Sequence, residues 1–335
     1  MKPAVLFGVL AIALCAVFIA ELALGPVAIA PGEVGAALWP WAAADDQNAL
    51  IVTAIRLPRA VLAALVGAIL AISGAAMQGL FRNPLADPSL IGVTAGASLG
   101  ASLAIVFGGA LAGAMGLTIV SIGAFIGAVL AVLLVYALAT RGARTSVTTM
   151  LLAGIAIGAL AGAATSLLEF SASNEMLRRI SLWQMGGLDG ATWARAGLLA
   201  GVAVPVVAGL LVLAPALNAL LLGESEARHL GFAVDAIKTV LIGLVALGVG
   251  VSVALAGAIV FVGLVVPHIV RLVIGPDHRL VLPGAALAGA VLLLGADVAA
   301  RLLVAPAELP VGLLTALVGA PFFILLLRGS RDYAL

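Results

Sequence analysis

The sequence has few charged residues. Only 9% of its 335 residues are Asp, Glu, Lys or Arg, while 64% are hydrophobic. Soluble domains carry about 25% charged residues, because charged side chains cover a surface that faces water. A chain so poor in charge cannot form a large soluble domain, and lipid must cover most of its surface. The composition therefore predicts a membrane protein.

Cysteine and lysine are nearly absent, and both absences exclude some chemistry. The single cysteine, Cys15, lies within the first apolar run, so it forms no internal disulfide and is expected to pack as a small apolar residue. The only lysines are Lys2 and Lys238, and neither follows a glycine-rich loop of the kind that binds the phosphates of ATP. We therefore expect that the chain does not hydrolyse ATP by itself.

Other catalytic and nucleic-acid sites are also missing from the sequence. The three histidines, His229, His268 and His278, stand far apart and lack the spacing of metal ligands. No Ser, His and Asp occur in a hydrolase order together with a nucleophile elbow. The net charge is only +1 and no Lys/Arg cluster suggests nucleic-acid binding. The sequence thus predicts no metal site, no enzyme and no nucleic-acid partner.

Apolar runs bounded by charged residues, Gly or Pro predict an all-α polytopic membrane protein with one domain over residues 1–335. The first run follows Lys2 and resembles a signal peptide, but its length of about 22 residues is enough to cross the membrane, so we expect it to be retained. The ten expected spans are 3–24, 57–80, 89–110, 117–139, 147–168, 193–213, 238–257, 259–274, 283–304 and 311–328.

Lys and Arg are distributed unequally between the two sides of these spans. An even number of spans places both termini on one side, and cytoplasmic loops carry more Lys and Arg than external ones. With both termini cytoplasmic, the cytoplasmic set is Lys2, Arg82, Arg141, Arg144, Arg228, Lys238, Arg271, Arg279, Arg328 and Arg331. The smaller external set is Arg56, Arg59, Arg178, Arg179, Arg195 and Arg301. We therefore expect cytoplasmic termini.

Glycines at four-residue spacing predict close helix packing. They form two series, Gly92, Gly96 and Gly100, and Gly154, Gly158 and Gly162. Each series leaves a strip without side chains on one helix face, so that a neighbouring backbone can approach.

Two further patterns concern the arrangement of the spans. In RNPLADPSLIG, Asp87 is expected to cap a helix that begins with Pro88, so that two spans reverse through residues 83–87. Residues 73–85 and 256–269 share Gly-Ala, then Gly-Leu, then Pro at similar spacing. The two copies differ in expected orientation, which is the pattern of an inverted repeat.

Acidic residues within the spans are scarce. Glu21 and Glu169 lie near expected helix ends, and Asp297 is the main intramembrane acid. Asp297 and Arg301 are four residues apart, so we expect an ion pair on one helix face. Carriers coupled to protons or sodium usually place such groups near the midplane. A secondary transporter is thus less favoured, but it stays an alternative, as do a membrane enzyme and a passive channel.

One short segment, LGESEARHLG (222–231), is polar and lies between two apolar runs. Gly223, Ala227 and Leu230 fall on one face of a short helix, which Gly231 is expected to end. Asp235 is expected to cap the next span. A simple connector needs only a few residues. The segment therefore predicts either docking of a cytoplasmic partner or a helix on the membrane surface.

Four long motifs resemble the permease subunits of the vitamin B12, iron-siderophore and haem class of ABC importers, the ten-helix type II importers. The motifs are residues 56–101, beginning RLPRAVLAALVGAILAISGAAMQG; LGESEARHLG; residues 257–290, beginning GAIVFVGLVVPHIVRLVIGPDHR; and residues 296–327, beginning ADVAARLLVAPAELPVG. They occur in the family's order and cover nearly the whole chain.

The resemblance implies partners on both sides of a bacterial inner membrane. A coupling segment at about 218–238, with Gly223, Ala227, Leu230 and Gly231, would dock one of two ATPase subunits below a permease homodimer. ATP would be used by that partner, and the chain itself would hold no permanent cofactor. A periplasmic binding protein would dock on the other side, on Arg56, Arg59 and Arg301, which we expect to be exposed at the external helix ends.

The cargo expected from this class is haem, a ferric siderophore or cobalamin. The extramembrane stretch 169–193 would lie at the mouth of the pathway. Arg178 and Arg179 suit the propionates of haem. Trp183 with Met176 and Met185 suits a flat apolar face. We therefore expect haem, with the siderophore and cobalamin as alternatives.

Overall fold

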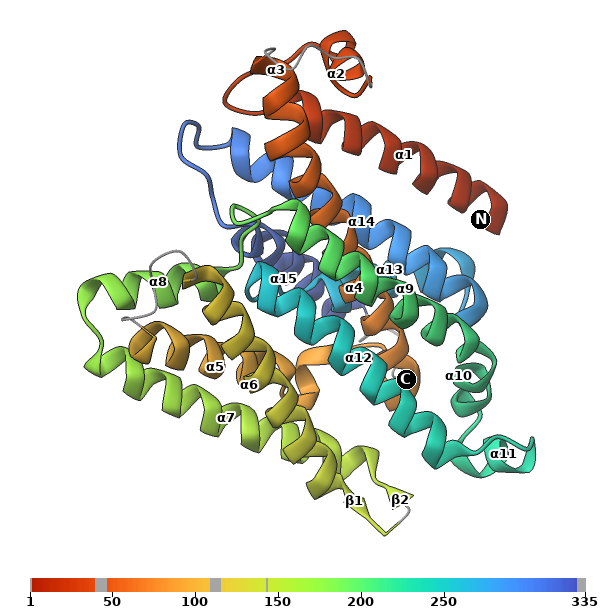
Figure 1. The fold of residues 1–335 in the computed structure, drawn as a ribbon. Helices are drawn as coiled ribbons and strands as arrows, with labels where there is room; N and C mark the ends of the chain where they lie inside the picture. The colour runs from red at the N-terminus through yellow and green to blue at the C-terminus, as the bar shows by residue number, and fades with distance from the viewer. Residues whose placement is uncertain (1, 40–46, 109–115, 143, 330–335) are drawn as a thin grey trace.

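All ten expected spans are α-helices in the structure (Figure 1). The computed structural model describes residues 2–39, 47–108, 116–142 and 144–329, and only the backbone of residues 116, 117 and 325–329. The ten helices are α1 (Pro3–Ala23), α4 (Leu57–Phe81), α5 (Val93–Phe107), α6 (Gly116–Ala139), α7 (Val147–Ser171), α9 (Trp193–Val212), α12 (Val234–Ala256), α13 (Val262–Ile274), α14 (His278–Leu302) and α15 (Val311–Gly329).

Shorter elements connect these helices. The π-helix Ile51–Arg56 runs directly into α4, and the 3₁₀ turn Pro88–Ile91 precedes α5. The others are α2 (Pro31–Ala37), α3 (Gln47–Leu50), α8 (Asn174–Met185), α10 (Ala214–Leu221), α11 (Glu224–His229) and the hairpin of β1 (Thr140–Arg141) and β2 (Arg144–Thr145).

Seven helices in the described part of the chain are long and apolar enough to cross a membrane, and α5, α13 and the first part of α15 are shorter apolar helices. The 13 residues of α13 extend about 20 Å, whereas a hydrocarbon core is about 30 Å thick. The helix α13 begins after an irregular segment, 257–261. Irregular backbone at membrane depth must be buried in protein.

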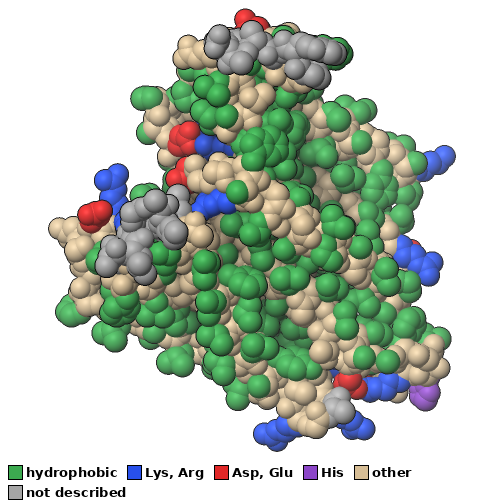
Figure 2. Space-filling model, in the orientation of Figure 1, with side chains coloured by type: hydrophobic (Ala, Val, Ile, Leu, Met, Phe, Trp, Pro, Cys, Tyr) green, Lys and Arg blue, Asp and Glu red, His purple; other side chains and the backbone are tan. Residues whose placement is uncertain are grey.

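The helix α4 lies at the centre of the bundle. In its most apolar window 78% of residues are buried, against 17% for α1 and 22% for α7, which therefore lie at the periphery. The helices α14, α13, α9 and α12 all contact α4. A space-filling view shows hydrophobic side chains over the waist of the molecule and charged ones gathered towards its ends (Figure 2). This distribution suits a bundle surrounded by lipid.

Glycines allow the closest helix contacts. A Cβ on Gly96 or Gly100 of α5 would overlap the carbonyl of Gly127 or Gly123 of α6. The expected close approach is therefore confirmed for α5. In the other series only Gly154 makes a close helix contact, because a Cβ there would overlap the Leu90 carbonyl. Among the described residues, the nearest atom to a Cβ on Gly158 is 3.9 Å away, and no atom lies within 4 Å of a Cβ on Gly162.

The two segments of the suspected repeat pack against one another. A Cβ on Gly74 of α4 would overlap the backbone of Gly263 of α13, so the central helix and the short helix touch without side chains between them. The expected cap is also present. The side chain of Asp87 accepts a hydrogen bond from the Ser89 amide, with Pro88 at the first position of the 3₁₀ turn.

The bundle has two polar ends. One, the α8 face, holds α2, α3, α8 and residues 303–310 (Figure 1). The opposite one, the α11 face, holds α10, α11 and the hairpin β1–β2. The helices α4 and α14 run between these faces, so each contributes side chains to both.

We predict that Gly96→Ala destabilises the bundle by about 1–3 kcal/mol, because the added methyl group forces α5 away from α6. Thermal unfolding of the purified chain in detergent measures this. Gly201→Ala is the matched control, since nothing lies within 4 Å of a Cβ on this glycine of α9 and Ala raises helix propensity. Equal midpoints for the two variants would contradict the packing argument.

Candidate functional site

Six charged residues form a largely buried cluster at the α8 face. We call it the α8-face charge cluster, and its members are Glu21, Arg56, Arg59, Asp297, Arg301 and Glu308. They come from α1, the π-helix, α4, α14 and the segment after α14. Burying charges is unfavourable unless each is paired and hydrogen-bonded, so the geometry of the pairing decides what these residues do.

Arg59 binds two carboxylates from distant parts of the chain. Its Nε lies 2.8 Å from Oδ2 of Asp297 and its Nη2 2.9 Å from Oδ1, which is a bidentate pair. Its Nη1 donates to Glu308 Oε2 at 2.8 Å. Asp297 is fully buried, whereas the Glu308 side chain is 37% exposed. Arg59 therefore joins α4 to α14 inside the protein and to the following segment at the surface.

Arg301 and Arg56 bind the end of α1. Arg301 pairs with the Glu21 carboxylate at 2.6 Å and donates to the carbonyls of Glu21 and Leu24. Arg56 donates to the carbonyls of Leu22, Ala23 and Val27. The last carbonyls of a helix lack partners within it and attract cations. The two arginines thus cap α1 and attach it to α4 and α14.

The expected exposure of these three arginines is wrong. Arg56, Arg59 and Arg301 are only 4%, 8% and 3% exposed, because buried carbonyls and carboxylates need their donors. The expected Asp297–Arg301 ion pair is confirmed at 3.5 Å, but Arg59 is the closer partner of Asp297. Docking of a binding protein on these arginines stays a prediction.

Glu21 and Glu308 belong to this cluster, although the sequence did not mark either as a site residue. Glu21 is fully buried, and its signal in the sequence is that it is the one acid in the first apolar run. Glu308 carries no local signal, since its partner Arg59 is 249 residues away.

A cavity of 510 Å³ opens beside the cluster. Arg178, Arg179 and Trp183 line it from α8, a helix that Ser173 caps by accepting from the Met176 amide. Both arginines line this cavity, and their expected place at the mouth of a pathway stays a prediction. Arg59, Arg195, Asp189 and Glu308 add charge, and Ile105, Val120, Leu182, Leu255 and Leu309 add apolar surface. The cavity is thus both cationic and apolar.

The two methionines do not line this cavity. Met176 is partly buried against the core and Met185 is 44% exposed outside the lining. Both lie on α8, but neither is among the residues that line the cavity. Their expected contact with a flat apolar cargo has no support in this arrangement.

The predicted coupling segment forms α10, α11 and the start of α12 at the α11 face. Gly223 (φ +118°) precedes α11 and Gly231 (φ +88°) ends it, both with backbone angles that glycine adopts readily. Gly231 therefore acts as the expected stop. Ala227 is fully buried, while Leu230 is 60% exposed.

Gly223, Ala227 and Leu230 were expected to form one face, but Ala227 is buried and Leu230 is exposed. Ala227 packs α11 on its own chain, and Leu230 points to the surface. Leu230 lies at the C-cap, just beyond the last helical residue of α11. Of these two side chains, only Leu230 is open to a partner.

Ion pairs attach α11 to its neighbours. Lys238, 2% exposed, reaches Glu224 at 2.5 Å and donates to the Thr145 carbonyl of β2 at 2.9 Å. Arg228 lies 3.2 Å from Asp235 and 3.5 Å from Glu224. Asp235 is not the expected cap of α12, which begins one residue earlier, at Val234, because its carboxylate binds Arg228 and the Thr145 amide instead.

A second link joins the segment to α14. The Asn218 amide of α10 donates to Asp277 at 2.6 Å, and its oxygen accepts from the His278 backbone amide at 2.8 Å. The Arg279 amide and then Asn218 hydrogen-bond the Asp277 carboxylate, which lowers its pKa below the ordinary value. A force on α10 therefore reaches the helix that carries Asp297.

We predict that Asp297→Asn destabilises the chain by about 3–5 kcal/mol, because Arg59 loses a buried charge partner and Arg301 its neighbour. The thermal midpoint in detergent is the measurement. The control Glu308→Gln removes only a partly exposed partner and is expected to cost less than about 1 kcal/mol. A small effect of Asp297→Asn would show that the buried pairing does not stabilise the fold.

Comparisons with known proteins find transport permeases. The chain is 46% identical over 278 residues to the hemin transport system permease protein HmuU of Yersinia pestis, covering 83% of each. It is 47% identical over 290 residues to the cobalamin import system permease protein BtuC of Halobacterium salinarum, covering 85% of this chain and 75% of that one.

A solved structure has a similar fold. That structure is an inward-facing conformation of a metal-chelate type ABC transporter. It superposes on this chain with a TM-score of 0.86 and 32% identity, covering 98% of this chain and 100% of that one. The FecCD transport family matches residues 12–329, nearly the whole chain. The resemblance drawn from the four motifs is confirmed, and the chain belongs to the FecCD transport family of permeases.

Proposed function

We propose that this chain is the membrane-spanning permease subunit of an ATP-driven importer that moves haem, or another iron chelate, from periplasm to cytoplasm by alternating access. The observation that carries the proposal is the cationic and apolar cavity at the α8 face, with Arg178, Arg179 and Trp183, in a chain similar to a hemin permease. The chain works as one permease domain.

The α11 face is the cytoplasmic one in this proposal, with both termini on that side of a bacterial inner membrane. The cations at this face support the orientation, because cytoplasmic loops are rich in Lys and Arg. They are Lys2, Arg82, Arg141, Arg144, Arg228, Lys238, Arg271 and Arg279. Arg331 lies outside the described residues, and the side chain of Arg328 is not described. Three of the six arginines at the α8 face are engaged in the charge cluster, so fewer remain free on that side.

The energy for transport comes from a partner. Leu230 offers the ATPase an exposed apolar contact, and the ion pairs of Lys238 and Arg228 transmit movement of α11 to α12 and β2. The chain itself needs no permanent cofactor. A two-state cycle requires a contact that differs between the states, and ATP-dependent docking at Leu230 supplies it.

The working assembly is a homodimer with two ATPase subunits and one periplasmic binding protein. The helix α7 supports the dimer, because among the described residues nothing lies nearer than 3.9 Å to a Cβ on Gly158 or Gly162, and such a strip would admit a second backbone. The pathway would then run between the two copies. The binding protein would dock at the α8 face, near Arg59 and Glu308.

Haem fits the cavity better than a smaller uncharged cargo. Two arginines on one turn of α8 can each pair with a carboxylate, and Trp183 offers an aromatic face. Cobalamin or a ferric siderophore is the alternative cargo, supported by the similarity to a cobalamin permease. An ion-coupled carrier is disfavoured, since the intramembrane acids Glu21 and Asp297 are both paired with arginine.

We predict that Leu230→Asp abolishes binding of the ATPase, because a carboxylate replaces an apolar contact at the proposed interface. The affinity of the purified permease for the ATPase is the measurement. Ser225→Asp is the matched control, since it places the same charge on the opposite side of α11. Both variants should melt like the wild type. Unchanged ATPase affinity of Leu230→Asp would refute the assigned contact.

Proteoliposomes test the transport itself. With the permease, its ATPase and its binding protein, we expect haem uptake that requires ATP hydrolysis at the α11 face and is insensitive to an ionophore. Arg178→Gln with Arg179→Gln should raise the KM for haem at least about tenfold, since two charge-assisted contacts are lost. ATP-driven uptake of cobalamin or a siderophore in place of haem would change the cargo. Uptake abolished by the ionophore alone would refute the importer.

A further inference from the structure

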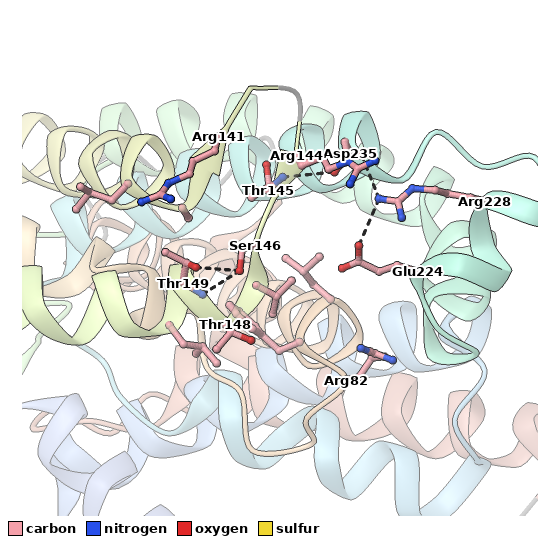
Figure 3. A pocket seen from close by; sticks show the side chains of 16 residues that line it. Arg82, Arg141, Arg144, Thr145, Ser146, Thr148, Thr149, Glu224, Arg228 and Asp235 are labelled. Carbon is pink, nitrogen blue, oxygen red and sulfur yellow. Dashed lines mark hydrogen bonds and ion pairs between the residues drawn. The ribbon is translucent and has the colours of Figure 1, made fainter.

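A larger cavity, of 890 Å³, lies at the α11 face (Figure 3). It is bounded by the end of α4, the hairpin β1–β2, the first turns of α7, and residues of α11 and α12. Its lining is divided between a cationic side and an apolar side, and the two sides together define what it can bind.

The cationic side has guanidinium groups without partners. Arg82, Arg141, Arg144 and Arg228 line the cavity. Of these, Arg228 pairs with Glu224 and Asp235. Within the part of the chain that the structure describes, Arg82, Arg141 and Arg144 form no ion pair and no side-chain hydrogen bond.

The two lining acids do not neutralise these three arginines. Glu224 is held by Lys238 at 2.5 Å, and Asp235 accepts from the Thr145 amide as well as from Arg228. Figure 3 shows the three free arginines on different sides of the space, with Arg228 turned to its carboxylates. An uncompensated positive field fills the cavity and favours an anion.

The N-terminus of α7 adds neutral donors. Ser146 caps the helix by accepting from the Thr149 amide at 3.2 Å, but the amides of Val147 and Thr148 have no acceptor within the helix. The hydroxyl of Thr148 also lines the cavity. Free amides at the positive end of a 25-residue helix, facing arginines, are the usual surroundings of a bound phosphate.

The apolar side indicates what the anion is attached to. The apolar side chains that line the cavity are Leu80, Phe81, Leu138, Val147 and Leu151. Beyond it, Leu152 and Ile155 of α7 are 64% and 63% exposed. A ligand with a phosphate at one end and an apolar part at the other would contact both sides.

From these contacts we propose that the cavity is a binding site for a phosphate ester, with the phosphate held by Arg82, Arg141, Arg144 and the N-terminus of α7. Guanidinium groups bind phosphate oxygens in a bidentate manner, which favours phosphate over a small halide ion. Two sources supply this chemistry, the headgroup of an anionic phospholipid and a soluble phosphate compound. The site is separate from the cavity at the α8 face and does not depend on the cargo.

The test uses the full chain in detergent and native mass spectrometry, with phosphatidylglycerol and phosphatidylcholine as probes. We expect Arg141→Gln with Arg144→Gln to weaken phosphatidylglycerol binding about thirtyfold, and Arg82→Gln alone about fivefold, because cations beside an anionic headgroup are removed. Phosphatidylcholine binding should stay weak in every variant. The matched control is Arg279→Gln, an exposed arginine of the same face outside the cavity.

Soluble phosphate forms the second arm. If inorganic phosphate raises the melting midpoint of the wild type and of Arg279→Gln, but not of the double variant, while phosphatidylglycerol shows no preference, the site binds a soluble phosphate. If the double variant and Arg279→Gln behave alike towards both probes, the proposal is wrong. Arg82→Gln keeps the test decisive if the double variant is poorly folded.

Discussion

The buried contacts of three arginines hold together the end of the bundle where transport would begin. Arg56 and Arg301 occupy the free carbonyls at the end of α1, and Arg59 joins α4 to Asp297 of α14. Each arginine is surrounded by acceptors from distant segments, so none can leave without exposing an unpaired charge or carbonyl. Gly25 leaves the space for two of the guanidinium groups, since a Cβ there would lie 2.9 Å from Arg56 and 3.3 Å from Arg301.

This cluster also determines how the two faces communicate. The helices α4 and α14, each of 25 residues, run from the cluster to the α11 face. They touch through Gly67 and Gly289 with no side chain between them, so they move as a pair. At the other end, Asn218 binds the start of α14, and the arginine that follows α4, Arg82, lies beside Gly223 of the coupling segment. In the proposed cycle, these contacts would carry movement of the coupling segment to Arg59 and Asp297.

Local patterns predicted much of this structure. Apolar runs located all ten helices, and Asp87 with Pro88 located one turn, because both depend on neighbouring residues alone. The burial of Arg56, Arg59 and Arg301 could not be predicted, since their hydrogen-bond acceptors lie 29 to 280 residues away. The same reason applies to Asp235, whose carboxylate accepts from the Thr145 amide 90 residues away rather than capping its own helix, and to Met176, which packs against the core.

The short helix α13 has a consequence for the cargo. The floor of the cavity at the α8 face includes Ala256 and Gly257, which directly precede the irregular segment before α13. Backbone packs on backbone there, with Gly257 against the Trp183 carbonyl and Gly312 against the Met185 carbonyl. In the proposed transport, a molecule held here would already have passed part of the bilayer. Under the proposed function, the barrier ahead of such a molecule would be about 20 Å long, the length of α13, rather than the full hydrocarbon thickness of about 30 Å.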